Sequence, residues 1–145
     1  MLADISIASE KAVFGDGHSK IGVAAGDHAT AIWPLAMGIA KAKYYLLTGE
    51  NLTATLAEKY GLVTEVVPHD QLMKRAEEVA LMLANGPQHA LKNTKYALNQ
   101  WLRQAVITSF DTSTALEMLN FGETDVQEGI QSFKEKRKPK FRSPL

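Results

Sequence analysis

Two histidines and two aspartates lie among glycines in residues 14–28, which read FGDGHSKIGVAAGDH. The glycines permit tight turns in which backbone and side chains approach one small volume. An unperturbed imidazole titrates near pH 6.5, so His18 has the chemistry of a general acid or base without a special environment. Asp27 could orient that imidazole by accepting a hydrogen bond. We therefore predict the functional site here, with His18, Asp27 and His28 as its titratable residues.

Each of these residues also has a purely structural interpretation. His18 could be a loop histidine that hydrogen-bonds to the backbone. Asp27 could cap the N-terminus of the following helix, and Gly26 could serve only a turn. The capping and catalytic interpretations of Asp27 are compatible, and both are kept as hypotheses.

The segments around this run predict short strands followed by helices. Apolar residues alternate with polar ones between Ile5 and Val13, which indicates one or two short strands. Helices are expected after Asp27, with Pro34 bending the first of them, and a short apolar extended piece is expected before Pro68. The segments predicted to be helical are 27–35, 39–47, 54–60, 72–83, 90–103, 105–119 and 123–136.

A basic tail follows the last predicted helix. Six cations lie within nine residues, and Phe133 precedes them. Cations beside an aromatic ring suit a phosphorylated nucleotide, whereas a solvated helix end is the plain alternative. Both interpretations stay open. The cations are Lys134, Lys136, Arg137, Lys138, Lys140 and Arg142.

Composition excludes several classes of function. Sixteen basic and sixteen acidic residues cancel, so no global charge recruits nucleic acid or a membrane surface. The absence of cysteine excludes disulfides and thiolate metal sites and fits a cytoplasmic protein. Apart from the loose pair His18 and His28, the four histidines lack zinc-ligand spacing, so we predict no metal. Phosphate-binding loop motifs do not occur. Trp33 and Trp101 are expected in the core.

Several motifs in order give the chain a family resemblance. Residues 14–28 are similar to the pattern F-G-x-P-E-x-x-x-G-x-x-P-G-A-G-G of the enoyl-CoA hydratase/isomerase (crotonase) superfamily. Matches follow at 41–43 (KAK), 47–50 (LTGE), 61–68 (GLVTEVVP) and 128–141 (EGIQSFKEKRKPKF). The chain resembles only the C-terminal part of that superfamily.

The resemblance implies a truncated α/β fold of crotonase type. Residues 1–67 would be the C-terminal part of the spiral core with the active-site turn, and residues 68–145 a helical oligomerisation region with the basic tail. It also implies a homo-oligomer based on trimers, or a partner carrying the upstream half. That half supplies both oxyanion-hole N–H groups and the first catalytic carboxylate of the family.

The resemblance implies roles for six residues. His18 stands where the family has its second catalytic glutamate, and Gly26 matches the glycine whose N–H positions the attacking water. His28 replaces a glycine and changes the shape of the substrate pocket, while Phe133 and Lys136 align with positions near the adenine and phosphates of coenzyme A. Some crotonase-like β-diketone hydrolases use a His and an Asp at the spacing of His18 and Asp27.

Three functions remain open at this point. The first is hydration or isomerisation of a 2-enoyl-CoA thioester, with the thioester as substrate and no other cofactor. The second is hydrolysis of a β-diketone. The third is a catalytically incomplete module that assembles through its helices, because removal of half of a family fold exposes apolar surface.

Overall fold

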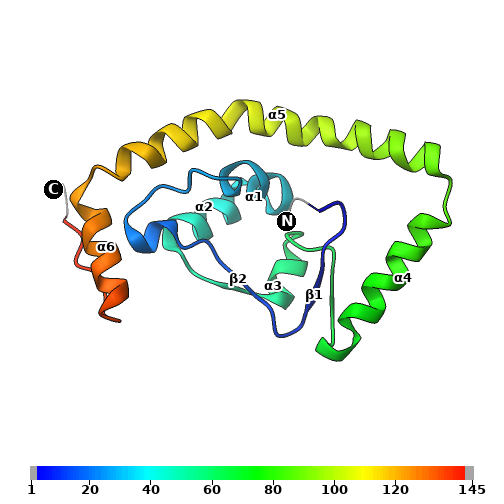
Figure 1. The fold of residues 1–145 in the computed structure, drawn as a ribbon, viewed down its shortest axis with the longest axis horizontal. Helices are drawn as coiled ribbons and strands as arrows, with labels where there is room; N and C mark the ends of the chain where they lie inside the picture. The colour runs from blue at the N-terminus through cyan, green and yellow to red at the C-terminus, as the bar shows by residue number, and fades with distance from the viewer. Residues whose placement is uncertain (1–2, 143–145) are drawn as a thin grey trace.

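The computed structural model describes residues 3–142 and places short strands before a mainly helical region (Figure 1). The elements in chain order are β1 (Ile7–Ser9), β2 (Val13–Phe14), a 3₁₀ turn η1 (His18–Ile21), α1 (Ala29–Met37), α2 (Ile39–Thr48), β3 (Leu52–Thr53), α3 (Ala54–Lys59), β4 (Glu65–Val67), a 3₁₀ turn η2 (His69–Gln71), α4 (Leu72–Ala84), α5 (Gln88–Asn120) and α6 (Thr124–Lys134).

The strands form two small pairs that join distant parts of the chain. β1 runs parallel to β4, with Ile7 opposite Glu65 and Ser9 opposite Val67. β2 runs antiparallel to β3 and aligns Phe14 with Leu52. The short strands predicted from the alternating apolar residues are therefore present, and their pairing fixes where the segment after Phe14 leaves the sheet.

The core lies between the strands and the first three helices. Leu52 is fully buried, and Trp33 of α1 and Tyr45 of α2 are 2% and 6% exposed. Small residues let the helices approach: Ala42 of α2 and Ala57 of α3 are almost completely buried. Burial of this apolar surface is the main favourable term in folding, and here it anchors both ends of the segment that carries the predicted site.

One helix replaces the two predicted for residues 90–103 and 105–119. α5 continues from Gln88 to Asn120, because no glycine or proline interrupts that run. Figure 1 shows α5 crossing above α1, with α4 descending from one end and α6 from the other. The helix therefore carries residues of its C-terminal half to the segment around His18.

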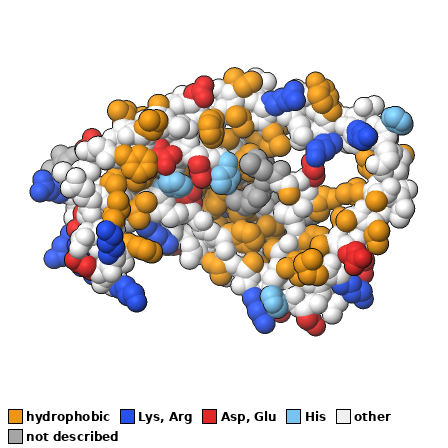
Figure 2. Space-filling view, in the orientation of Figure 1, with side chains coloured by type: hydrophobic (Ala, Val, Ile, Leu, Met, Phe, Trp, Pro, Cys, Tyr) orange, Lys and Arg blue, Asp and Glu red, His pale blue; other side chains and the backbone are white. Residues whose placement is uncertain are grey.

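The prediction that both tryptophans lie in the core is wrong for Trp101. Its side chain is 70% exposed on α5, whereas Trp33 is buried. Further apolar side chains are exposed along α4 and α5, and Figure 2 shows hydrophobic side chains spread along these helices. Between residues 3 and 142, no helix is both long and apolar enough to cross a membrane.

A cavity of about 970 Å³ lies between the N-terminal segment, α1, α4 and α5. Ile5, Leu35, Leu98 and Trp101 are among the residues that line it. All four are at least 38% exposed, so apolar surface faces this cavity without being covered by described residues.

Candidate functional site

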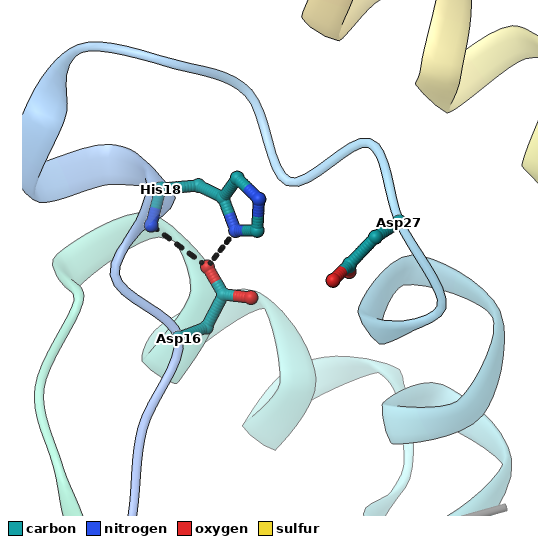
Figure 3. A group of neighbouring side chains, drawn as sticks. All are labelled: Asp16, His18 and Asp27. Carbon is teal, nitrogen blue, oxygen red and sulfur yellow. Dashed lines mark hydrogen bonds and ion pairs between the residues drawn. The ribbon is translucent and has the colours of Figure 1, made fainter.

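His18 is held by Asp16 within a single turn (Figure 3). One carboxylate oxygen of Asp16, Oδ1, accepts the backbone N–H of His18 at 3.1 Å and lies 2.9 Å from the ring Nδ1. The Asp16 side chain is only 7% exposed. Asp16 lies between Gly15 and Gly17, and Gly17 has ordinary right-handed helical torsions, φ −94° and ψ −5°, at the start of η1. The His18 ring is therefore fixed by its own loop.

The hydrogen bond to His18 that was expected from Asp27 is made by Asp16 instead. The N-cap residue of α1 is His28 and not Asp27 as predicted, but Oδ1 of Asp27 accepts the backbone N–H of Ala29, the first residue of the helix, at 2.9 Å. The other oxygen of Asp27, Oδ2, lies 3.2 Å from Nδ1 of His28. The carboxylate of Asp27 still lies within 4.8 Å of a His18 ring nitrogen. Its predicted role in catalysis stays a prediction.

Gly26 brings the loop against α5. Its carbonyl accepts hydrogen bonds from the hydroxyls of Ser113 at 3.0 Å and Thr114 at 2.9 Å. A Cβ at residue 26 would collide with the side chain of Glu117 and lie 2.8 Å from the carbonyl oxygen of Ser113. This close approach explains the glycine in structural terms, and the role of its N–H in positioning water stays a prediction.

The same approach places Glu117 beside His18. Oε1 of Glu117 lies 3.7 Å from Nε2 of His18, and both side chains are about one-fifth exposed. Sequence reasoning missed Glu117, because only the path of α5 brings it to the loop. Figure 2 shows histidine and acidic side chains side by side beneath α5.

The carboxylates around His18 favour its charged form. Burial is the largest single influence and lowers the pKa of His18, but the hydrogen bond to Asp16 and the charges of Asp16, Asp27 and Glu117 together outweigh it. The pKa of His18 is therefore raised above its ordinary value of 6.5. An imidazole in this setting binds a proton readily near neutral pH and can return it to a reacting group.

The raised pKa of His18 predicts a pH-dependent stability. A histidine with a higher pKa in the folded chain stabilises the fold below its unfolded pKa, near 6.5, and this stabilisation is lost as the pH rises through the folded pKa. We expect His18→Gln to lose more free energy of unfolding at about pH 5.5 than at about pH 8.5 in urea titrations. His89→Gln, on the exposed start of α5, is the control. An equal loss at both pH values would contradict the prediction.

Asp16, His18 and Asp27 are also the residue types that bind metal ions. One potential ligand atom from each lies within 4.8 Å of the others. The Nδ1 of His18 is already engaged with Asp16, and Oδ1 of Asp27 accepts the backbone N–H of Ala29. These bonds leave Nε2 of His18 available, so the prediction that the chain binds no metal stays a prediction.

Phe133 and Lys136 lie apart from this cluster but share a pocket with residues of η1. The pocket has a volume of about 710 Å³ and is lined by Ser19 and Lys20 of η1 together with Phe133, Lys136 and Lys138. Phe133 is 79% exposed, and Lys136 has a positive φ of 53°, which a non-glycine residue rarely adopts. The pocket wall thus combines an aromatic ring with lysine side chains, and cations of this kind bind phosphate groups.

Comparisons with known proteins place this geometry in context. Residues 1–144 match the sequence profile described as Enoyl-CoA hydratase/isomerase. A short-chain-enoyl-CoA hydratase from Clostridioides difficile is 37% identical over 134 residues, which cover 92% of this chain and 86% of that protein. An enoyl-CoA hydratase from Mycobacterium avium subsp. paratuberculosis K-10 has a similar structure, with a TM-score of 0.91 and 30% identity over 97% of this chain and 57% of that one.

A third relative is named for a different activity, the hydrolysis of β-diketones. The structure of ABDH, a β-diketone hydrolase from Anabaena sp. PCC 7120, bound to (S)-3-oxocyclohexyl acetic acid, is 40% identical, with a TM-score of 0.76. The match covers 86% of this chain and 49% of the Anabaena chain. The chain spans about half the length of both solved structures and of several curated relatives.

Proposed function

Because the chain belongs to the enoyl-CoA hydratase/isomerase family, we propose that it carries the acid–base part of a site that hydrolyses a carbon–carbon bond in a β-diketone. The observation that carries this proposal is the His18 imidazole, hydrogen-bonded to Asp16 and surrounded by two further carboxylates. A histidine so placed can deprotonate water near neutral pH, and the carboxylates stabilise the imidazolium that results.

The proposed reaction balances with water as the only co-reactant. His18 takes a proton from a water molecule as the oxygen of that water bonds to one carbonyl carbon of the diketone. The bond from that carbon to the central carbon then breaks, and its electron pair forms the enolate of the second carbonyl. The imidazolium of His18 returns the proton to the central carbon, which leaves a carboxylic acid and a ketone.

The remaining residues have supporting roles in this proposal. The charges of Asp27 and Glu117 favour the imidazolium, and the N–H of Gly26 is assigned to the attacking water. His28, partly exposed beside Asp27, borders the approach of the substrate. The enolate oxygen needs hydrogen-bond donors, which the family resemblance assigns to the upstream half of the fold, so a polypeptide that carries this half belongs to the proposal.

Relatives support hydrolysis in one specific way. The Anabaena protein, called a β-diketone hydrolase, is bound to a molecule with one ketone and one carboxylic acid. These are the two groups that hydrolysis of a β-diketone creates.

The direct test is turnover of cyclic and bicyclic β-diketones in water enriched in ¹⁸O. The chain is assayed alone and mixed with a polypeptide that carries the upstream half of the Anabaena relative. A keto acid with ¹⁸O in its carboxyl group is the expected product. Turnover of a 2-enoyl-CoA thioester without any diketone cleavage would contradict the proposal.

Hydration of a 2-enoyl-CoA thioester is the second candidate, favoured by the pocket that contains Phe133 and Lys136. Lys20 and Lys136 could contact the phosphates of coenzyme A, and Phe133 could stack on its adenine. In this reaction His18 would take a proton from the attacking water and give a proton to the α-carbon of the substrate. The thioester is then the substrate, and no separate cofactor is needed.

Calorimetry with an unreactive acyl-CoA analogue separates the two candidates. For the hydratase, we expect saturable binding that Lys136→Ala weakens by about tenfold, the effect of losing one charge-assisted contact. Lys74→Ala, on the exposed face of α4, is the matched control and should bind as the unchanged chain does. Absence of binding would contradict the hydratase candidate and leave the diketone reaction, which needs no coenzyme A.

We also propose that the chain assembles with further protein through α5. Trp101, Ile107 and Met118 are 67% to 79% exposed along this helix, and exposed apolar surface is typical of interfaces. A homo-oligomer or a partner with the upstream half would bury them. Light scattering across protein concentrations measures the first, and the mixed assay above addresses the second.

A further inference from the structure

We propose that Asp16 is a positioning residue: it holds His18 with the proton on Nδ1, so that Nε2 is the nitrogen that exchanges protons with water or substrate. This inference rests on the proposed function only for the identity of the reaction. The arrangement of the ring itself follows from contacts within residues 16–18 and can be measured without turnover.

Asp16 makes two contacts through one oxygen. Oδ1 accepts the backbone N–H of His18 and faces the ring Nδ1 at 2.9 Å. The backbone contact anchors the carboxylate to the same residue whose ring it orients. Figure 3 shows the ring and the carboxylate facing each other across this turn. The pair therefore needs no other element to form.

An ionised carboxylate only accepts hydrogen bonds, so Nδ1 must be the donor. The neutral ring then carries its lone pair on Nε2. Free histidine prefers the opposite arrangement with the proton on Nε2, and the buried position of Asp16 strengthens the bond that reverses this preference.

Nε2 lies on the side of Glu117, whose Oε1 is 3.7 Å away, too long for a direct hydrogen bond. Both side chains keep about one-fifth of their surface exposed. Because Nδ1 is engaged with Asp16, Nε2 is the ring nitrogen left to exchange a proton with a water molecule or the substrate.

Asp27 cannot substitute for Asp16 in this arrangement. One of its oxygens accepts the N–H of Ala29, and the other lies beside His28. Asp27 acts on His18 through its charge alone, so it should influence how readily the ring is protonated but not which nitrogen carries the proton of the neutral ring.

The test is the nitrogen NMR spectrum of the full chain labelled with ¹⁵N-histidine. Long-range ¹H–¹⁵N correlation distinguishes a protonated ring nitrogen from one with a lone pair, and His18→Gln identifies the His18 signals. We expect neutral His18 with its proton on Nδ1. In Asp16→Ala the proton should move to Nε2 and the pKa of His18 should fall; Asp16→Leu, which is of similar size and cannot accept a hydrogen bond, serves if the alanine variant fails to fold.

Asp27→Asn is the matched control, because the amide oxygen of asparagine can still accept the backbone N–H of Ala29 while one charge near His18 is removed. It should lower the pKa of His18 and leave the proton on Nδ1. Neutral His18 with its proton on Nε2 in the unchanged chain would overturn the inference, as would an unchanged tautomer in both Asp16 variants.

Activity adds a readout that separates this inference from the proposed function. If diketone cleavage is detected, Asp16→Asn should lower kcat by at least about tenfold and shift the pH profile toward lower pH. If the NMR result holds but no diketone is cleaved, the proposed reaction fails and the assignment of Asp16 stands. If diketone is cleaved and the tautomer is on Nε2, the assignment of Asp16 fails alone.

Discussion

Replacing His18 by glutamine is expected to lower the rate of β-diketone hydrolysis by about 10²- to 10⁴-fold, the usual contribution of a positioned general acid or base. Glutamine keeps a polar side chain of similar reach but cannot bind and release a proton. Asp16, Asp27 and Glu117 raise the pKa of the imidazole, and their effect on proton transfer through His18 is lost with that ring. The rate should be followed as loss of the diketone in the assay that contains the upstream polypeptide.

His89→Gln provides the matched control for this loss. It removes a histidine from the exposed start of α5, and its rate should equal that of the unchanged chain. Circular dichroism of both variants excludes unfolding as the cause. A His18→Gln variant with full activity would show that His18 is a structural loop histidine after all.

Gly129→Ala is expected to reduce the free energy of unfolding by about 1–3 kcal/mol, the usual cost of overpacking a close contact. A Cβ at residue 129 would collide with backbone atoms of Ile21, which cannot rotate away as a side chain can. The change would push α6 from η1, which carries both His18 and part of the Phe133 pocket. Urea titration measures the loss.

Gly122→Ala separates this effect from a general intolerance of the region. It lies between α5 and α6, and an added Cβ there would make only an ordinary contact with the carbonyl of Leu119 at 3.5 Å. Its stability should change by less than about 0.5 kcal/mol, as at most surface sites. Equal losses in the two variants would contradict a specific contact between Gly129 and Ile21.

The family and its crotonase-type α/β fold were predictable from motif order, and the matching profile and solved structures confirm both. Local signals also placed most helices, because glycine, proline and capping residues act within one turn. Thr53 caps α3, with its hydroxyl oxygen accepting the N–H of Leu56 at 3.3 Å. The predicted boundary between a core part, residues 1–67, and a helical oligomerisation region, residues 68–145, stays a prediction.

The candidate site was predictable only where it is local. The run around His18 was identified because its residue types are unusual for a loop. The choice of Asp27 over Asp16 as the partner of His18 failed, because Asp27 commits a carboxylate oxygen to the backbone N–H of Ala29. The sequence Asp-Gly-His was the signal that could have identified Asp16, because it places a carboxylate two residues before the imidazole of His18. Glu117 gave no signal, since its place depends on how α5 packs across α1.

Trp101 and Glu117 lie on one uninterrupted helix, and an α-helix transmits movement as a stiff rod. They are about 24 Å apart along its axis at 1.5 Å per residue. A tilt of α5 by about 5° at Trp101 would therefore displace the Glu117 carboxylate by about 2 Å, more than half of its 3.7 Å distance from His18. Protein bound to the exposed middle of α5 would in this way bear on the distance between Glu117 and His18.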